Sequence, residues 1–270
     1  MQILVKVLTV SLNSVDYKPA ETLLQHFTFC KPTTPGPGSV GEVIQAPLGC
    51  SYHKEDYVFG TAKNAFAGGM LAEYAIADMC HVVSLGRISP EEGDAIPIAG
   101  LTAYQSVIPR VKPRNRILIN GGSVTVSCSG RNAELCRSLG AEVIDYTRGT
   151  LLQDLKAASS DRKFDLVVDN IYTNPELFWK AHEYTTKDAP YALTPFTASA
   201  SFIRLFLPTN LKWSKRLKMG DWIIEKQIKV VFDRVVPFEQ ANRVLERIAF
   251  GWTVGKIIVK ATGSQYVEKD

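Results

Sequence analysis

Short apolar runs separated by turn residues fill the first third of the chain. Five runs rich in apolar and β-branched residues lie at residues 3–10, 40–46, 57–60, 71–77 and 81–84. Runs of this length, bounded by Gly, Pro, Asn and Asp, predict β-strands. Pro and Gly fill residues 31–38, which excludes a helix there. The first third is therefore predicted to be a compact, mostly β unit.

The pattern changes at Ser89. Ser89, Pro90 and Glu92 form the signature of a helix start, with an N-cap, a first-turn proline and a capping box. Beyond it, strand-like and helix-like segments alternate. Strands are predicted at 117–120, 124–128, 142–145, 164–169 and 191–193, and helices at 96–107, 131–139, 151–158 and 175–184. Such alternation indicates a parallel sheet covered by helices, so the fold class is α/β.

The last segments return to a different pattern. Residues 229–233 predict a strand, 238–250 an amphipathic helix, 256–260 a closing strand and 263–270 a frayed tail. Near the other end, residues 13–19 predict a turn that opens a short helix, with Asp16 as its cap.

Composition narrows the class of protein. The chain has 270 residues, 46% hydrophobic and 21% charged, which suits one large domain or two smaller ones with a buried core. The net charge is +4, and the only basic cluster of note is the 212–218 run, without an aromatic-rich basic face. That run predicts a solvated or phosphate-facing loop rather than a nucleic-acid interface. The sequence has no run of about 18 apolar residues, so no membrane-spanning helix is predicted.

The cysteines indicate a reducing compartment. There are 5, widely spaced and without a C-x-x-C pair: Cys30, Cys50, Cys80, Cys128 and Cys136. An odd number at such spacing argues against a disulfide framework and a structural zinc site. The N-terminal segment alternates and contains Lys6, so it is interpreted as a strand rather than a signal peptide. We expect reduced thiols and a cytoplasmic location.

Several segments together resemble a known family. In chain order they are ILVKVLTVSLNSVDYKP, TTPGPGSVGEVIQ, DYVFGTAKNAFAGGMLAEYAIAD, ISPEEGDAIPIAGLTAYQSV and VFDRVVPFEQANRVLERIAFGWTVGKIIVK. Their order and spacing resemble the medium-chain dehydrogenase/reductase superfamily, in its zinc-free quinone oxidoreductase and enoyl reductase branch.

The resemblance implies a two-domain fold. A partly β, GroES-like catalytic domain would comprise residues 1–88 and 236–270, and a Rossmann-like cofactor domain would comprise residues 89–235. The active site of the family lies in the cleft between such domains. Family members are often dimers joined through the edge of the cofactor sheet, which makes a homodimer an expectation for this chain.

The resemblance also implies a dinucleotide site. The pyrophosphate would lie at Gly121 and Gly122, in the only trace of a glycine-rich loop. Ser129 and Arg131 follow the second strand of the predicted Rossmann unit, and no Asp or Glu stands at that strand end to bind a ribose 2′-OH. A Ser and an Arg suit a 2′-phosphate, which favours NADPH. The alternative is that these two residues form only a helix N-cap and a solvated first turn.

Two further positions match the family's cofactor site. Tyr146 resembles a residue that helps to hold the same phosphate, and Thr102 resembles one that lines the nicotinamide pocket. Thr102 fits a packed helix residue equally well.

For the chemistry, the zinc-free branch transfers hydride from nicotinamide to the β-carbon of an activated double bond. The turn that would carry the active-site residues contains Asn13, Asp16, Tyr17 and Lys18. Tyr17 or Lys18 could donate a proton or a hydrogen bond, and Asn13 could bind the carbonyl or the nicotinamide ribose. The alternative is a capped structural turn.

Metal ligation is not expected. Metal-dependent members carry an early Cys, where this chain has Asn13, and a Gly-His-Glu that is missing here, as is the four-Cys zinc lobe. The histidines do not fall at ligand spacing: His26, His53, His81 and His182.

The chain departs from the family pattern in four places. The strands that usually precede the first segment, and parts of 194–210 and 211–233, are expected to be short or absent. The fourth departure is that only Ser123 separates Gly122 from Val124, where a glycine loop and a helix are expected. Because parallel neighbours normally need a crossover of about a dozen residues, we expect 116–132 to form a hairpin or to leave the sheet, without the helix of the pyrophosphate site.

Two functions follow from these observations. The first is an NADPH-dependent, zinc-independent reductase of a small enone, quinone or enoyl thioester, with no nucleic-acid or membrane partner. The second is a non-catalytic, truncated relative that acts as a binding or regulatory protein.

Overall fold

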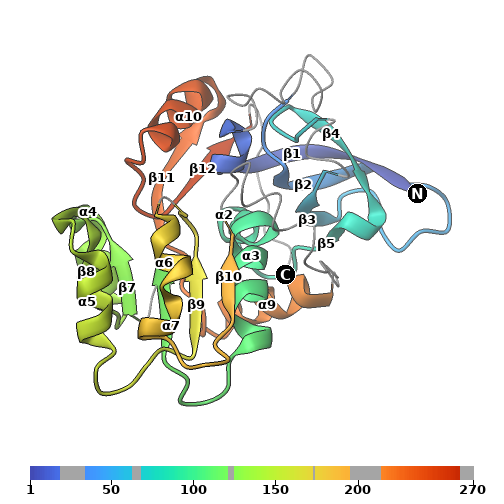
Figure 1. Cartoon of the computed structure of the whole chain (residues 1–270). Helices are drawn as coiled ribbons and strands as arrows, with labels where there is room; N and C mark the ends of the chain where they lie inside the picture. The colour runs from blue at the N-terminus through green and yellow to red at the C-terminus, as the bar shows by residue number, and fades with distance from the viewer. Residues whose placement is uncertain (19–33, 63–67, 121–124, 173, 195–213, 262–270) are drawn as a thin grey trace. The chain divides into compact units, whose positions relative to one another are not determined.

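The computed structural model describes residues 1–18, 34–62, 68–120, 125–172, 174–194 and 214–261 (Figure 1). Its contacts divide the chain into two units. Unit 1 comprises Met1–Leu101 and Asn210–Asp270, and unit 2 comprises Thr102–Thr209. The domain limits expected from the sequence, at 88/89 and 235/236, stay a prediction.

Unit 1 is built on a 7-stranded sheet in the order β11-β12-β1-β2-β3-β5, with β4 also paired to β1. The strands are β1 (Gln2–Leu12), β2 (Gly38–Gln45), β3 (Tyr57–Thr61), β4 (Tyr74–Asp78), β5 (Val82–Ser84), β11 (Phe232–Pro237) and β12 (Lys256–Lys260). The five strands expected in the first third are confirmed. The strand expected at 229–233 lies a few residues later, at β11. Among the strand pairings of this sheet, only that of β11 with β12 is parallel.

Short helices cover this sheet. They are η1 (Ser14–Asp16), η3 (Met79–His81), α2 (Pro90–Ala95), η4 (Ile96–Gly100), α9 (Ser214–Ile224), η7 (Phe238–Gln240) and α10 (Ala241–Ala249). The predicted capping box is confirmed at α2, where Ser89 Oγ accepts the Glu92 N–H at 3.3 Å and donates to the Glu92 carboxylate at 2.8 Å. Val244 of α10 packs against Val10 and Ile257 of the sheet.

Unit 2 contains a 5-stranded parallel sheet in the order β10-β9-β6-β7-β8. The strands are β6 (Ile117–Asn120), β7 (Thr125–Cys128), β8 (Glu142–Asp145), β9 (Leu166–Asp169) and β10 (Tyr191–Leu193). The helical elements are α3 (Leu101–Val107), which begins one residue before the unit, η5 (Ile108–Arg110), α4 (Gly130–Ser138), η6 (Tyr146–Arg148), α5 (Leu151–Ala158), α6 (Pro175–Trp179) and α7 (Ala181–Tyr184). The single helix expected at 175–184 is therefore two helices.

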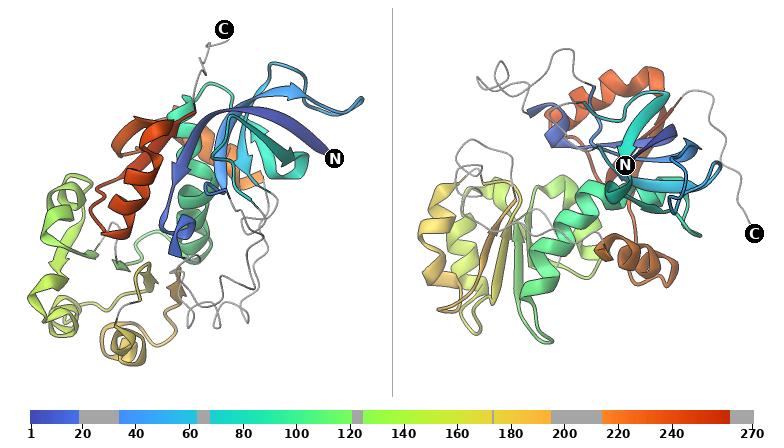
Figure 2. Two further views of the ribbon diagram at one scale, coloured as in Figure 1. Left: turned by 90° about the horizontal axis from the view of Figure 1, so that it is seen from above. Right: turned by 90° about the vertical axis from the view of Figure 1, so that its right-hand side faces the viewer.

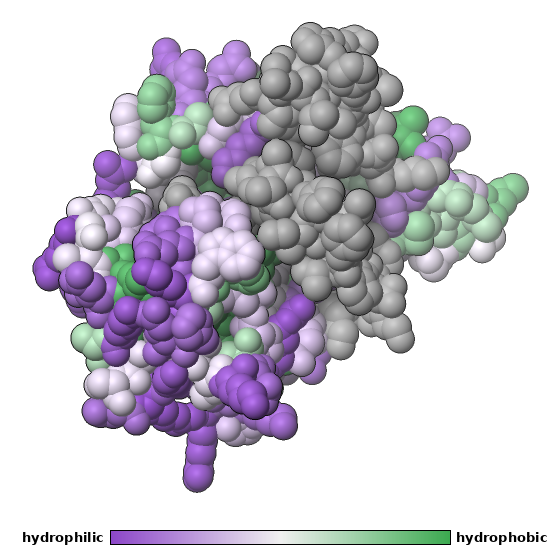
Figure 3. Space-filling model, viewed as in Figure 1, coloured by the Kyte–Doolittle hydropathy of each residue, from purple (hydrophilic) through white to green (hydrophobic). Residues whose placement is uncertain are grey.

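Helices cover both faces of this sheet (Figure 2). On one face, Leu155 of α5 and Tyr184 of α7 pack against Leu118. On the other face, Ala133 of α4 packs against Val126. The side of unit 2 seen in Figure 3 is mostly hydrophilic, as expected for the outer faces of covering helices.

The relation between β6 and β7 corrects one prediction. They are parallel neighbours, paired at Leu118↔Thr125, Ile119↔Val126 and Asn120↔Ser127, so the region 116–132 neither forms a hairpin nor leaves the sheet. Residues 121–124, with Gly121 and Gly122, lie outside the described part of the chain, and four residues are too few for a crossover helix.

The register explains why so short a link suffices. β7 begins level with Leu118, two residues before β6 ends. The chain must therefore return by only about 7 Å along the strand and about 5 Å sideways. The five Cα–Cα steps from Asn120 to Thr125 can span up to about 18 Å. A longer crossover is needed where the second strand begins further back along the first, or where the connection itself contains a helix.

The close approach of β3 and β5 provides a test of the sheet in unit 1. A Cβ added at Gly60 would lie 2.1 Å from the His81 carbonyl oxygen, which is backbone and cannot rotate away. We expect Gly60→Ala to lower the free energy of unfolding by about 3 kcal/mol, measured by chemical denaturation.

Gly220→Ala is the matched control. The nearest atom to its added Cβ is Ile88 Cδ1 at 3.7 Å, an ordinary contact within unit 1. Because Ala has the higher helix propensity, this variant should match the wild type or exceed its unfolding free energy by up to about 1 kcal/mol. Equal midpoints for the two variants would contradict the packing argument.

Candidate active site

The turn after β1 carries the first group of candidate residues. Asn13 is extended (φ −142°, ψ 168°) and begins η1. Its backbone N–H donates to Asp16 Oδ2 at 2.6 Å, and the Gly36 N–H donates to Asp16 Oδ1 at 2.6 Å. Asn13 is thus the N-cap, and Asp16, which was expected to be the cap, is the third residue of the capping box, whose carboxylate accepts the N-cap N–H. Burial raises the pKa of Asp16, while these two N–H groups oppose the shift.

The carboxamide of Asn13 is held at both ends. Its Nδ2 donates to the Ser11 carbonyl oxygen at 3.1 Å, and its Oδ1 accepts from Lys256 Nζ. Lys256 Nζ also donates to the Leu12 carbonyl oxygen at 3.3 Å. An amide has two N–H donors and two acceptor lone pairs, so these two contacts use one of each.

A buried carboxylate lies behind this lysine. Asp94 of α2 is 0% exposed, and neither of its oxygens has a hydrogen bond of ordinary geometry to any described residue. Burial raises the pKa of Asp94 to about 7, partly offset by Lys256 and by the hydroxyls of Thr9 and Ser11. Burial lowers the pKa of Lys256 to about 8, partly offset by Asp94 and Asp16. The turn is therefore backed by two oppositely charged groups, each of which burial drives towards its neutral form.

Sequence reasoning missed Lys256 and Asp94. The available signal was a charged residue directly before an apolar run, Asp94 before AIPI and Lys256 before IIV. Nothing in the spacing joins them, because they are brought together only by the pairing of β12 with β1 and the packing of α2 on β1.

Tyr17 and Lys18 continue the turn, and both are partly buried. Tyr17 is the C-cap of η1, and its backbone N–H donates to the Ser14 carbonyl oxygen. The structure thus links Asn13 and Asp16 directly, whereas Tyr17 and Lys18 are placed beside them by chain continuity. Their roles as donors stay a prediction.

The second group of candidates lies in unit 2, at the start of α4. Ser129 is the N-cap of α4, but its side chain makes no capping hydrogen bond to the helix. Arg131 is exposed in the first turn, and Asn132 has a buried Oδ1 with no partner in the described regions. A helix N-terminus with a hydroxyl that does not cap it, an exposed guanidinium and an amide oxygen without a partner in the described regions fits the phosphate and hydroxyl groups of a nucleotide ribose.

An acid from the next strand lies beside this helix start. A Cβ built on Gly130 would be 3.4 Å from Asp145 Oδ2, at the end of β8. The hydroxyl and N–H of Thr147 lower the pKa of Asp145. β7 ends without an acid as expected, but β8 brings one to the same place, which sequence reasoning missed although IDYT contains it.

A cavity of about 360 Å³ opens between α4, β8, η6 and α5. The cavity is lined by acidic, basic, small and apolar residues: Gly130, Ala133, Arg137, Val143, Ile144, Asp145, Arg148 and Asp154. Tyr146, 39% exposed, begins η6 at its border. Thr102 is partly buried in α3, where its carbonyl oxygen accepts from Ser106 Oγ at 2.8 Å.

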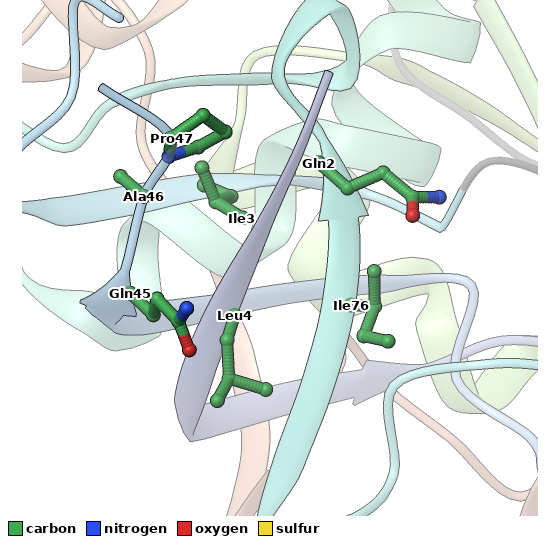
Figure 4. A pocket seen from close by; sticks show the side chains of 7 residues that line it. All are labelled: Gln2, Ile3, Leu4, Gln45, Ala46, Pro47 and Ile76. Atoms are coloured by element: carbon green, nitrogen blue, oxygen red, sulfur yellow. The ribbon is translucent and has the colours of Figure 1, made fainter.

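A second pocket, of about 330 Å³, lies in unit 1 between β1, β4 and the end of β2 (Figure 4). Its lining contains no ionisable side chain and no candidate residue: Gln2, Ile3, Leu4, Gln45, Ala46, Pro47 and Ile76. It is separate from the turn at Asn13.

In the described part of the chain, no group of three or more His, Cys, Asp or Glu side chains could hold a metal ion. Four cysteines in it are free thiols: Cys50, Cys80, Cys128 and Cys136. None of its helices has the length and apolar character needed to cross a membrane.

Comparison with known proteins identifies the family. The family model described as zinc-binding dehydrogenase matches residues 139–259. The chain is 34% identical, over 310 aligned positions, to the trans-enoyl reductase pgmF of Aspergillus terreus, with 96% of this chain and 86% of that protein covered. The chain belongs to the medium-chain dehydrogenase/reductase superfamily.

Other members of the superfamily agree with this placement. The chloroplastic quinone-oxidoreductase homolog of Spinacia oleracea is 29% identical, with 96% of this chain and 89% of that protein covered. The structure of the quinone oxidoreductase from Coxiella burnetii has a TM-score of 0.81 at 22% identity, covering 96% and 90% of the two chains. The JamJ enoyl reductase has a TM-score of 0.77 at 16% identity, covering 96% and 91%.

These findings confirm the expected architecture of this superfamily member, a GroES-like part and a Rossmann-like part. Its enoyl reductase and quinone oxidoreductase relatives support an oxidoreductase that acts on a small molecule, and homologues in the superfamily generally use nicotinamide cofactors.

The buried carboxylate gives a pH-dependent stability. Because folding raises the pKa of Asp94 from 3.8 to about 7, the folded state binds more protons between these values. The free energy of unfolding contributed by Asp94 is therefore present at low pH and is lost as the pH rises towards 7. Relative to Asp94→Asn, we expect the wild type to lose up to about 4 kcal/mol across that window. Denaturant unfolding from pH 5 to pH 8 measures the part of this loss that is accessible.

Asp165→Asn is the control. The Arg116 N–H lowers the pKa of Asp165, so the stability that it contributes is lost only as the pH falls below its ordinary range. Its difference from the wild type should be flat above pH 5. A flat difference for Asp94→Asn as well would contradict the assignment.

Proposed function

We propose that this chain is an NADPH-dependent reductase that transfers hydride to an activated C=C bond without zinc. The proposal rests mainly on one observation. Over 96% of its length, the chain aligns with a protein named as a trans-enoyl reductase. The substrate class is an enone, a quinone or an enoyl thioester.

The residues at the start of α4 support the choice of NADPH. When bound there, NADPH supplies the hydride. Arg131 would bind the 2′-phosphate through its guanidinium, with Ser129 Oγ and Tyr146 as further hydrogen-bonding groups. Asp145 opposes a phosphate and is itself balanced by Arg137 and Arg148 at the same cavity. Thr102 would line the nicotinamide side.

The turn after β1 supports the reduction step. The contacts to Ser11 and Lys256 use one N–H of the Asn13 carboxamide and its oxygen. Its second N–H would donate to the substrate carbonyl and stabilise the negative charge that develops on it, or bind the nicotinamide ribose. Tyr17 or Lys18 would supply the proton that completes the reduction at the α-carbon. Asn13 also stands where metal-dependent members carry a cysteine ligand, which supports a reaction without zinc.

A second candidate function is a non-catalytic binding or regulatory protein. The link of four residues between β6 and β7 favours it, since a crossover helix and its N–H donors have no room there. Losing two or three charge-assisted hydrogen bonds forfeits about 3–9 kcal/mol. A micromolar cofactor has only about 8 kcal/mol of binding free energy. Cofactor binding therefore decides between the two functions.

The NADPH assignment predicts a selective effect of Arg131→Ala. Because the variant removes a charge-assisted hydrogen bond to the 2′-phosphate, we expect NADPH to bind about 10- to 100-fold more weakly, with NADH unchanged. Fluorescence titration of both nucleotides measures this. Arg243→Ala, an exposed arginine of α10, should change neither affinity.

The outcomes separate the alternatives. Equal losses for NADPH and NADH, or none, would remove the role of Arg131. Absence of binding by the wild type at millimolar concentrations of both nucleotides would favour the non-catalytic function.

Turnover is tested with NADPH and two probes, crotonyl N-acetylcysteamine thioester and 1,4-naphthoquinone. We expect consumption of NADPH with at least one probe, at a rate that a metal chelator leaves unchanged. A rate abolished by the chelator and restored by zinc would contradict the metal-free reaction.

A cytoplasmic location and a homodimer stay predictions.

A further inference from the structure

Lys256 joins two parts of the chain at the candidate active-site turn. The ladder between β1 and β12 runs from Thr9↔Lys260 to Leu12↔Ile257, so Lys256 stands next to Asn13 just beyond the last pair. Its Nζ donates to the Leu12 carbonyl oxygen and to Asn13 Oδ1. The ladder needs no ammonium at this position, since its hydrogen bonds are made by backbone groups.

The two contacts of the Asn13 carboxamide determine which way it faces. Lys256 can only donate, so the amide oxygen must face it. The Ser11 carbonyl can only accept, so the amide nitrogen must face that side. The two ends of an amide are nearly equal in size, and a rotation by 180° would exchange the positions of its NH2 group and its oxygen. Lys256 and Ser11 together exclude that exchange.

Two acidic groups act on Lys256 electrostatically. Asp16 of η1 and Asp94 of α2 are the acidic groups that act on it from the elements packed around it. Asp94 is fully buried and lacks a hydrogen bond of ordinary geometry to the described residues, so the ammonium is its principal counter-charge. The hydrogen bonds of Nζ to the Leu12 carbonyl oxygen and to Asn13 Oδ1 give this ammonium a defined position from which to orient Asn13.

We propose that Lys256 is a positioning residue, whose ammonium fixes the Asn13 carboxamide in the one orientation that binds the substrate carbonyl or the nicotinamide ribose. This rests on the proposed function, in which Asn13 touches the substrate or cofactor and Lys256 acts only through it.

The kinetic test uses Lys256→Met, Asn13→Ala and the double variant, with NADPH and the thioester and quinone probes. Methionine keeps a long unbranched side chain and removes the ammonium. We expect Lys256→Met to lower kcat about 10- to 100-fold, the value of one charge-assisted hydrogen bond. The double variant should be no slower than Asn13→Ala, because both changes remove one interaction.

Lys260→Met is the matched control. Lys260 lies on the same strand, but its Nζ pairs with Glu91 Oε1 at 2.7 Å, at the end of β12 away from Asn13. Its kcat should stay within about twofold of the wild type, as for an exposed ion pair. An unchanged kcat in Lys256→Met, or losses that multiply in the double variant, would overturn the proposal.

A spectroscopic measurement separates this proposal from the proposed function. In ¹⁵N-asparagine-labelled protein, the side-chain amide resonances of Asn13 are those lost in Asn13→Ala. We expect them to move in Lys256→Met and to stay in place in Lys260→Met. Inactivity of the wild type with every probe would end the proposed function, whereas unmoved resonances would end the positioning role, whatever the activity.

If Lys256→Met does not fold, the same proposal is tested by a pH titration of the wild type. The Asn13 resonances should then shift as the pH is raised through the deprotonation of Lys256, with Asp94 and Asp16 as the charged groups that face it. Resonances that do not respond between pH 7 and pH 10 would overturn the proposal.

Discussion

Strand β1 is the element on which unit 1 depends, because its backbone pairs with three other strands. One edge bonds to β2, and the other bonds first to β4 and then to β12. Eleven residues thereby bring the first third of the chain and its last described segment into one sheet. The apolar side chains of β1, among them Val5, Val7 and Val10, lie in the core beneath it.

The same strand ends in polar groups at the candidate site. Thr9 and Ser11 are buried near the Asp94 carboxylate, and Asn13 leaves the strand towards Lys256 and Asp16. Burying charges this close to an apolar core is costly unless they face one another. Asp16 and Lys256 are hydrogen-bonded to the turn, and both acids act on the lysine electrostatically.

Unit 2 reaches a Rossmann-like sheet by an unusual route. Its first two strands are parallel neighbours although only four residues separate them. This is possible because the strands are short and overlap at few positions. The candidate phosphate-binding groups that the structure describes lie at the start of α4 and around the end of β8.

The sequence by itself determined the order and type of most elements. Hydrophobic periodicity depends on local spacing, so the strands of both sheets, the capping box at Ser89 and the α/β class could be predicted from neighbouring residues. The turn at Asn13 and the helix start at Ser129 were found for the same reason. Local patterns also placed the cap of the first turn at Asp16, the third residue of its capping box, instead of at Asn13, and predicted one helix where two occur at 175–184.

Only the tertiary structure decided the rest, since it depends on residues far apart in the chain. The parallel pairing of β6 with β7 is a matter of register, which no count of linker residues reveals. Lys256 and Asn13 lie 243 residues apart, and backbone pairing of β1 with β12 makes them neighbours. Asp94 becomes a buried charge only when α2 packs on β1. The protonation of a buried charged group depends on partners that are distant in the sequence. The sequence therefore showed the turn but not the groups that surround it.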